Sequence, residues 1–440
     1  MCPLNAALLP RDTLARLLDK LVGVEGIMLD VWWSLCEPTP GSFDFSRYRP
    51  IFQMAIERNL KIQAVLSFHT CGESEGDQVV ISLPPFIRQL QPQYPFLFYT
   101  DEDGEWSWEC LSLSADHAKV FPSAQGVCRR TALDMYEDFM RAFYEEFSSW
   151  IGTHIVQIQV SMGPSGELRY PSFALSRWKF PGMGAFQCYD ERMQQDYRDY
   201  IAAITTRNHH HGTDSFHRRE KEEEVVVFPC YQTCGRGYNM LPWQTPFFGE
   251  GIAETERGKT FLEWYSSKLL CHGEDMLERA RRVFHSQVEI ACKVAGIHWL
   301  YKTKHRAAEA IAGYYVSDRF HFYQRLASLL KKYGATWIFT CFEKRDEWED
   351  KAAKCSPESL IRETWSIAAS LDVPFAAENA LEMKRDEEYE QVLEKADWCR
   401  RNGHPLSCFT LLRLSEELIS PDHVDRWATF VQHMQQSPPI

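Results

Sequence analysis

The chain has 440 residues, of which 45% are hydrophobic and 25% are charged, so it can bury a large core and is not a disordered protein. Its formal net charge of −13 and sequence pI of 5.6 argue against nucleic acid or an anionic membrane as a partner, because an acidic surface repels polyanions. A neutral substrate is easier to accommodate. Length alone would allow two or three domains, but a single α/β barrel with insertions also reaches this size.

Fourteen cysteines follow no regular spacing, and several lie inside apolar runs, among them Cys292, Cys341 and Cys408. A buried thiol in such a run behaves as a small hydrophobic group, which favours a reducing compartment. Met1 is followed by neither a basic stretch nor an apolar leader core, and no apolar run is long enough to span a bilayer. We therefore expect a soluble, cytoplasmic protein, unless a targeting segment is missing from the N-terminus.

Short apolar runs alternate with amphipathic helical patterns along the whole chain, which is typical of βα units around a parallel sheet. The runs cover residues 1–4, 26–33, 61–69, 155–160, 288–296, 335–343, 373–379 and 406–414. The clearest helical patterns cover residues 11–22, 47–59, 130–150, 318–333 and 386–402. Eight units predict a single (β/α)₈ TIM barrel over residues 1–440. Its first strand would be truncated, because residues 1–4 supply only the end of one.

Two connections, residues 70–130 and 171–287, are much longer than is usual between such units, and we expect them to build one wall of a cleft. Within the second, residues 205–227 are polar and charged, which predicts a mobile or disordered insertion. The insertion holds four histidines, and Cys230 and Cys234 follow it, but no pair has the tight spacing of a structural zinc site. No metal is therefore expected.

Polar residues gather at the carboxyl ends of the apolar runs, which is where a barrel places its active site. That coincidence would be unusual in a purely structural protein. The residues are Asp30, His69, Glu167, Lys293, His298, Thr340, Glu378 and Arg413.

Glu167 and Glu378 are the strongest catalytic candidates among four acids at this rim, the others being Asp30 and Glu343. Two glycines and two prolines rigidify the turn around Glu167, in GPSGELRYP, and the amide of Asn379 beside Glu378 is suited to a sugar hydroxyl. Cleavage of a glycosidic bond needs one carboxylic acid and one carboxylate on opposite sides of it. Each glutamate alone would more often be a solvated or ion-paired rim residue, but the flanking motifs favour catalysis.

Residues 67–80, SFHTCGESEGDQVV, have the character of a lid, because Gly72 and Gly76 bracket polar residues and the loop reaches an acid, Asp77. Such glycine-hinged loops close over barrel mouths and exclude water. An ordinary βα turn is the alternative interpretation.

Tryptophan rings and two cations complete the predicted rim. Trp32, Trp33 and Trp299 are suited either to stacking on sugar rings or to packing in the core. Lys293 and Arg413 would lie near the acids, where a cation holds Glu378 ionised or binds hydroxyl groups.

Several of these segments follow one another in an order that resembles a known enzyme family. They include GIMLDVWW, SFHTCG, GPSGELRYP, GIHWLYKT, AAEAIAGYY, FTCFEKRD, ENAL and LLRLSEEL. From Met1 to about Leu418 the chain resembles the β-amylases, glycoside hydrolase family 14, which release maltose from the non-reducing ends of α-1,4-glucans. The resemblance implies exo-acting, inverting hydrolysis of starch-like glucans to β-maltose, with no cofactor. We also expect a monomer.

The resemblance also implies a role for each site residue. Glu167 would be the general acid and Glu378 the general base that activates water, with their carboxyl groups roughly 6.5–9.5 Å apart. The implied substrate contacts come from Asp30, His69, Asp77, Lys293, His298, Thr340, Asn379, Ala380 and Arg413.

The chain departs from the family pattern in its lid, which normally reads closer to GGNVGD. Here Glu73 and Glu75 add two charges to a loop that must close over a neutral sugar. With the truncated first strand, this leaves open a non-catalytic glucan-binding or regulatory protein on the same scaffold. A retaining barrel glycosidase of other linkage specificity is a third hypothesis.

Overall fold

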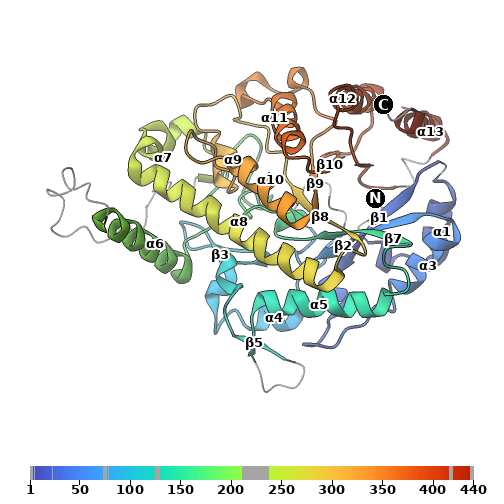
Figure 1. The fold of residues 1–440 in the computed structure, drawn as a ribbon, viewed down its shortest axis with the longest axis horizontal. Coiled ribbons are helices and arrows are strands. Elements are labelled where there is room, and N and C mark those ends of the chain that lie inside the picture. Colours follow the sequence, from blue (N-terminus) through green and yellow to red (C-terminus); the bar gives the residue numbers. More distant parts are fainter. Residues whose placement is uncertain are drawn as a thin grey trace.

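The computed structural model describes residues 3, 5–21, 23–72, 77, 79–123, 129–210, 237–415 and 420–436. A seven-stranded sheet occupies its centre, with its strands in the order β1-β2-β7-β8-β9-β10-β11 and every neighbouring pair parallel (Figure 1). The strands are β1 (Gly26–Trp32), β2 (Lys61–Ser67), β7 (Ile155–Val160), β8 (Glu289–Val294), β9 (Ala335–Phe339), β10 (Phe375–Glu378) and β11 (Phe409–Thr410).

Seven of the eight predicted strand runs therefore form strands of this sheet, in the predicted order. The first run, residues 1–4, lies outside the described residues except for Pro3. The two outer strands approach each other, since Thr410 of β11 donates a hydrogen bond to Gln63 of β2 at 3.4 Å and Leu412 packs against Met28 and Val65. The sheet is thus nearly closed, and the prediction of a (β/α)₈ barrel is confirmed.

Helices surround this sheet (Figure 1). They are α1 (Arg11–Asp19), α2 (Trp33–Cys36), α3 (Arg49–Glu57), α4 (Pro85–Gln89), α5 (Ala132–Phe147), α6 (Glu191–His210), α7 (Pro246–Gly249), α8 (Glu256–Phe284), α9 (Ala307–Ile311), α10 (Phe322–Tyr333), α11 (Pro357–Ser370), α12 (Asp386–Arg401) and α13 (Pro421–Gln436). Helices α1, α3, α5, α10 and α12 confirm the five helical patterns predicted.

Helix α5 shows how the sequence produces one of these elements. Thr131 and Asp134 form a capping box, in which each side chain accepts a hydrogen bond from the other's backbone N–H at 3.1 and 2.9 Å. Phe139 and Phe143, four residues apart on one face, meet the ring of Phe45 at centroid distances of 5.5 and 5.8 Å. The helix therefore begins at a defined residue and buries an aromatic stripe against the barrel.

The two long connections carry structure of their own. Residues 70–130 contain α4, an antiparallel pair formed by β3 (Phe98–Thr100) and β4 (Trp106–Leu111), and a second pair formed by β5 (Phe121–Pro122) and β6 (Arg129–Arg130). The second connection, residues 171–287, ends in a long helix. There the 29-residue helix α8 packs against the barrel, capped by the Thr255 hydroxyl, which accepts from Gly258 N–H at 3.1 Å.

The first residues of the predicted mobile insertion, 205–210, continue α6. The helical pattern of residues 191–204 extends into them despite their polarity. Residues 211–227, with Cys230 and Cys234, lie outside the described residues, so the insertion and the absence of a metal there stay predictions.

The barrel interior is built in layers, because residues two apart on a strand face the same side. One layer from β8, β9 and β10 consists of Ala291, Ile338 and Ala376. Two residues farther along the same strands, at their carboxyl ends, come Lys293, Thr340 and Glu378. The apolar layer thus closes the barrel interior from below, and the layer above it carries polar and charged side chains.

All ten cysteines in the described part of the chain are free thiols. Cys292 and Cys341 are buried as predicted, whereas Cys408 is exposed, contrary to prediction, because it precedes the two-residue strand β11. Among the described helices, none has the length and apolar character that crossing a membrane requires.

Candidate active site

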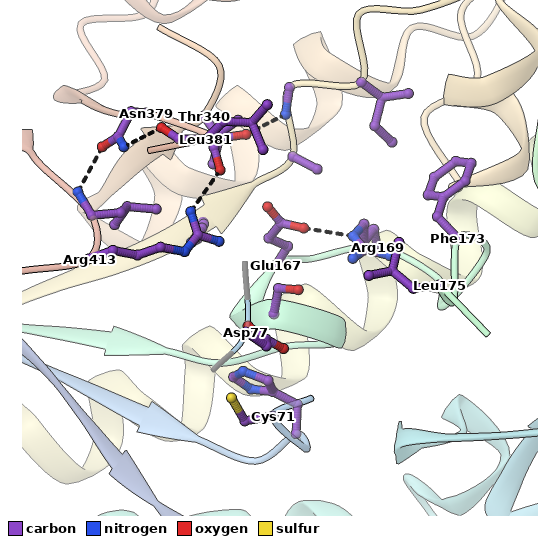
Figure 2. A pocket seen from close by; sticks show the side chains of 18 of the residues that line it. Cys71, Asp77, Glu167, Arg169, Phe173, Leu175, Thr340, Asn379, Leu381 and Arg413 are labelled. Carbon is purple, nitrogen blue, oxygen red and sulfur yellow. Dashed lines mark hydrogen bonds and ion pairs between the residues drawn. The ribbon is translucent and has the colours of Figure 1, made fainter. Parts of the chain in front are cut away.

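A cavity of about 440 Å³ lies at the carboxyl ends of the barrel strands (Figure 2). Ten of the eleven predicted site residues line it. They are Asp30, His69, Asp77, Glu167, Lys293, His298, Thr340, Asn379, Ala380 and Arg413. The eleventh, Glu378, is fully buried beside the lining residue Lys293. The fold therefore brings residues from almost the whole length of the chain to one place.

The turn after β7 presents Glu167 to this cavity. Ser165 and Gly166 adopt φ angles of +55° and +75°, which reverse the chain within the short 3₁₀ segment Pro164–Gly166. The next residues return to the sheet, where Leu168 N–H donates to the Lys293 carbonyl oxygen at 2.8 Å. The Glu167 side chain projects toward the cavity beside Arg169, whose Nε donates to its Oε2 at 2.7 Å (Figure 2).

Glu378, the last residue of β10, forms an ion pair with Lys293, whose Nζ lies 2.9 Å from Glu378 Oε2. Burial pushes the pKa of Lys293 down, but the charges of Glu378 and then Glu167 outweigh burial and leave that pKa raised. Lys293 is therefore a cation at neutral pH, and it interacts with the charges of both acids. Glu378 Oε1 is buried and accepts no hydrogen bond from the residues that the structure describes.

Asp30 and His69 lie on the wall formed by β1 and β2. Burial raises the pKa of Asp30 to about 6, although a hydrogen bond from Ser67 Oγ at 2.9 Å and the charge of Lys293 oppose the rise. Burial, reinforced by the charges of Lys293 and Arg169, lowers the pKa of His69 to about 3. His69 is thus neutral at pH 7, which suits a wall that binds uncharged hydroxyl groups.

Asn379 holds two loops of the opposite wall together (Figure 2). Its Oδ1 accepts from Leu412 N–H at 2.7 Å, and its Nδ2 donates to the Leu381 carbonyl oxygen at 2.7 Å. Arg413 Nη1 donates to the carbonyl oxygen of Ala380 at 3.1 Å. The amide of Asn379, predicted to bind a sugar hydroxyl, is therefore also engaged in shaping the wall.

Glu343, the fourth predicted rim acid, does not line the cavity. Its carboxylate accepts from Ala380 N–H at 3.0 and 3.1 Å and from Leu381 N–H at 3.0 Å. Glu343 therefore positions the 380–381 turn and is not aimed at a substrate.

Asp77 lines the cavity, and its Oδ2 accepts from Gly72 N–H at 2.7 Å. Residues 73–76 lie outside the described residues, so the lid and the effect of Glu73 and Glu75 on it stay predictions.

The three tryptophans divide between cavity and core. Trp32 and Trp299 line the cavity, and Trp299 Nε1 donates to the Gly182 carbonyl oxygen at 3.0 Å. Trp33 is buried away from the cavity, where its Nε1 donates to Glu37 at 2.5 Å and its ring meets Tyr136 edge-on. Of the two roles left open for Trp33, the structure supports packing in the core.

Several lining residues were not predicted, the most important of which is Arg169 beside Glu167. Arg169 belongs to the GELRYP motif, but the orientation of its side chain depends on the Ser165–Gly166 turn. The remaining unpredicted side chains form an aromatic and apolar wall and a small charged group, and they include Phe173, Leu175, Trp178, Phe180, Lys344 and Glu349. The density of aromatic residues after the motif was the available signal. The start of the second long connection, from Phe173 to Phe180, builds part of the cleft wall as predicted.

Residues 9–438 match the model of "Glycosyl hydrolase family 14". The chain belongs to this family. Among its relatives are two rice proteins (Oryza sativa subsp. japonica) named "Beta-amylase 2, chloroplastic" and "Beta-amylase 1, chloroplastic". They are 39% and 40% identical over 95% of this chain and 72% and 75% of the relatives.

A solved structure extends the comparison to the fold. The catalytic domain of a β-amylase from Paenibacillus polymyxa matches with a TM-score of 0.74 and 27% identity, covering 97% of this chain and 94% of that one. The (β/α)₈ barrel is therefore shared along the whole chain, including the segments that line the cavity.

The relatives correct the prediction of a cytoplasmic protein. The two rice proteins and an Arabidopsis thaliana relative, 39% identical over 94% of this chain and 70% of its own length, are all named chloroplastic. They point to the plastid. The prediction rested on the residues after Met1, and a transit peptide that is removed on import contributes nothing to the folded domain.

Proposed function

We propose that this chain hydrolyses α-1,4-glucosidic linkages in starch-like glucans, releasing β-maltose from non-reducing ends with inversion. The observation that carries the proposal is that Glu167 and Lys293 line one cavity of a family 14 barrel, and that Glu378 is buried beside it in an ion pair with Lys293. Two carboxyl groups that interact with one cation would supply the acid and the base that glycosidic cleavage requires.

In the proposed reaction, Glu167 donates its proton to the glycosidic oxygen as the bond to the anomeric carbon breaks. Glu378 takes a proton from a water molecule, whose oxygen attacks that carbon from the opposite face, and this inverts its configuration. Lys293 favours the ionised form of Glu378 before the attack, and Arg169 fixes the direction of the Glu167 carboxyl group. Exchange of one proton with solvent restores each glutamate.

The remaining predicted residues would bind the maltosyl unit through its hydroxyl groups. Asp30 and His69 lie on one wall, and Thr340, Ala380 and Arg413 lie on the other. All of these groups come from one chain, which supports the proposal that a monomer is active; sedimentation of the active protein tests that point.

The test is to replace Glu167 and Glu378 singly by Gln and to measure maltose release from soluble starch alongside maltose binding. Each change keeps the shape of the side chain but removes its proton transfer, so we expect turnover to fall by about 10²- to 10⁴-fold while maltose still binds. Glu347→Gln, on a side chain that is 70% exposed, serves as the matched control. Near-normal turnover in either active-site variant would show that the roles are misassigned.

The same experiment distinguishes the hydrolase from a non-catalytic glucan-binding protein. In that alternative, the unsubstituted chain would bind maltose but release no maltose from starch. The family and its β-amylase relatives do not favour that alternative.

A further inference from the structure

Three side chains that could ligate a metal ion meet at the edge of the cavity. The ligand atoms of His298, Glu349 and Cys355 lie within 4.8 Å of one another, and His298 Nε2 is 3.6 Å from Glu349 Oε1. His298 and Cys355 are buried, and His298 and Glu349 line the cavity. Two ligands of a tetrahedral zinc ion lie about 3.4 Å apart, so the histidine and the glutamate already have nearly this separation.

The orientation of His298 provides a second, independent observation. Its Nδ1 lies 2.9 Å from the carbonyl oxygen of Gly296, and because a carbonyl only accepts hydrogen bonds, Nδ1 carries the hydrogen. Nε2 is buried, on a residue that is only 7% exposed, and it has no hydrogen-bond partner within the described part of the chain. An imidazole whose second nitrogen donates to a backbone carbonyl is the usual arrangement of a metal-binding histidine.

Backbone hydrogen bonds hold the segments that carry these ligands side by side. Ser356 N–H donates to the His298 carbonyl oxygen at 3.0 Å, and Leu300 N–H donates to the Ala353 carbonyl oxygen at 2.8 Å. Cys355 therefore lies opposite His298 in the folded chain, and ion binding would require side-chain adjustment only.

We propose that His298, Glu349 and Cys355 bind a zinc ion that inhibits the enzyme. Imidazole, carboxylate and thiolate together favour Zn²⁺ over Mg²⁺ and Ca²⁺, which prefer oxygen ligands throughout. With three protein ligands, the fourth position of the ion faces the cavity. The ion would remove His298 from the sugar site, and this inhibitory part rests on the function proposed above.

Lys344 is the natural competitor of the ion, since its Nζ lies 3.1 Å from Glu349 Oε1 and neutralises that carboxylate in the metal-free chain. Zinc must displace this ammonium group, whose side chain is 19% exposed, from the carboxylate. Replacing Lys344 by Met should therefore tighten zinc binding, whereas a purely structural ion-pair cluster would only become less stable.

The first test titrates the full chain with Co²⁺, a spectroscopic substitute for zinc, in the presence of reductant. The wild type should develop a thiolate-to-cobalt charge-transfer absorption that Zn²⁺ abolishes, and Cys355→Ser should lack it. Cys271→Ser, which removes an exposed thiol on α8, is the matched control and should retain it. Absorption of equal strength in wild type and Cys355→Ser, or none in the wild type, would overturn the site.

The second test measures maltose release against zinc concentration. Cys355 does not line the cavity, so Cys355→Ser should keep its metal-free activity and need at least about tenfold more zinc for half inhibition. A chelator should restore activity in the wild type. Cysteine-dependent zinc binding that leaves maltose release unchanged would overturn inhibition. A metal-free wild type that releases no maltose would contradict the proposed hydrolase and not the zinc site.

Discussion

Lys293 is the residue on which the electrostatics of the cavity depend. Its ammonium group is buried, lies 2.9 Å from Glu378 and interacts with the charges of Glu167 and Asp30. Removing one partner of such a pair typically costs about 3–5 kcal/mol, because the other charge is then left buried without compensation. Removing the Lys293 ammonium would therefore leave the buried Glu378 carboxylate without compensation.

Asp30 should give the site a measurable cost in stability. Its folded-state pKa of about 6 lies above the ordinary 3.8, so the folded chain holds this proton more tightly than the unfolded chain does. The stability that Asp30 contributes is therefore greatest below about pH 4 and is lost as pH rises through about 6. Asp30→Asn should raise the unfolding free energy at pH 7 by up to about 3 kcal/mol, because Asn carries no charge that burial would penalise, and should weaken maltose binding.

Urea unfolding of the wild type and Asp30→Asn at pH 4 and pH 7 measures this difference. The two proteins should be nearly equal at pH 4. A gain of the same size at both pH values would show that the ionisation of Asp30 is not its cause.

At the level of single residues, the family resemblance of short motifs predicted eleven site residues. The fold brings all eleven to the cavity or directly beside it. The apolar runs alone could not distinguish Glu343 from Glu378, because both acids follow one; the neighbouring Asn379 and the family resemblance favoured Glu378. One ends inside the barrel beside a lysine, whereas the other accepts two backbone N–H groups of the 380–381 turn. That difference depends on which way each side chain points.

At the level of elements, the turn from Gly163 to Arg169 determines where Glu167, the proposed general acid, lies. A methyl group added at Gly163 would lie 2.5 Å from the Glu167 carbonyl oxygen and 2.6 Å from that of Arg169, which is closer than real contacts allow. Gly163→Ala should therefore displace Glu167 and lower kcat by about tenfold or more, since misplacement by about 1 Å can cost 10²-fold.

Gly104→Ala is the control for this change, because a methyl group there has no neighbour within 4 Å among the described atoms. Its cost should fall on stability alone. The measurement is kcat for starch hydrolysis by both variants. An unchanged kcat in Gly163→Ala would mean that the turn adjusts without moving Glu167.

The strands were predictable because parallel strands buried on both faces appear in the sequence as continuous apolar runs. Helix α8 was not, because its buried face includes Ser266, His272 and Gly273 among its apolar residues. His272, for example, is buried with its Nδ1 2.8 Å from Asp116, a partner 156 residues away in the chain. Tertiary pairs of this kind cannot be inferred from periodicity.

For the molecule as a whole, the last helix holds the end of the chain against the barrel. Phe430 of α13 is buried and contacts Tyr389 of α12 and Phe409 of β11 at centroid distances of 5.3 and 5.7 Å. Helix α13 lies on the same side of the molecule as β1 (Figure 1), and Gln435 donates to the Gly23 carbonyl oxygen. The cluster thus holds the ends of the sheet together.

Phe430→Ala should lower the free energy of unfolding by about 3–5 kcal/mol, because it leaves a cavity among these rings. Trp243→Ala, at a side chain that is 54% exposed, is the control and should cost much less. Equal losses in a denaturant titration would contradict a role for α13 in closing the fold.

The anomer of the first maltose released tests the account most directly. A maltooligosaccharide blocked at its reducing end is incubated with the chain, and the products are followed by proton NMR before mutarotation is complete. If Glu167 and Glu378 act as acid and base on opposite sides of the bond, β-maltose appears first and α-maltose grows only afterwards. The first appearance of α-maltose, or the release of no maltose at all, would contradict the account.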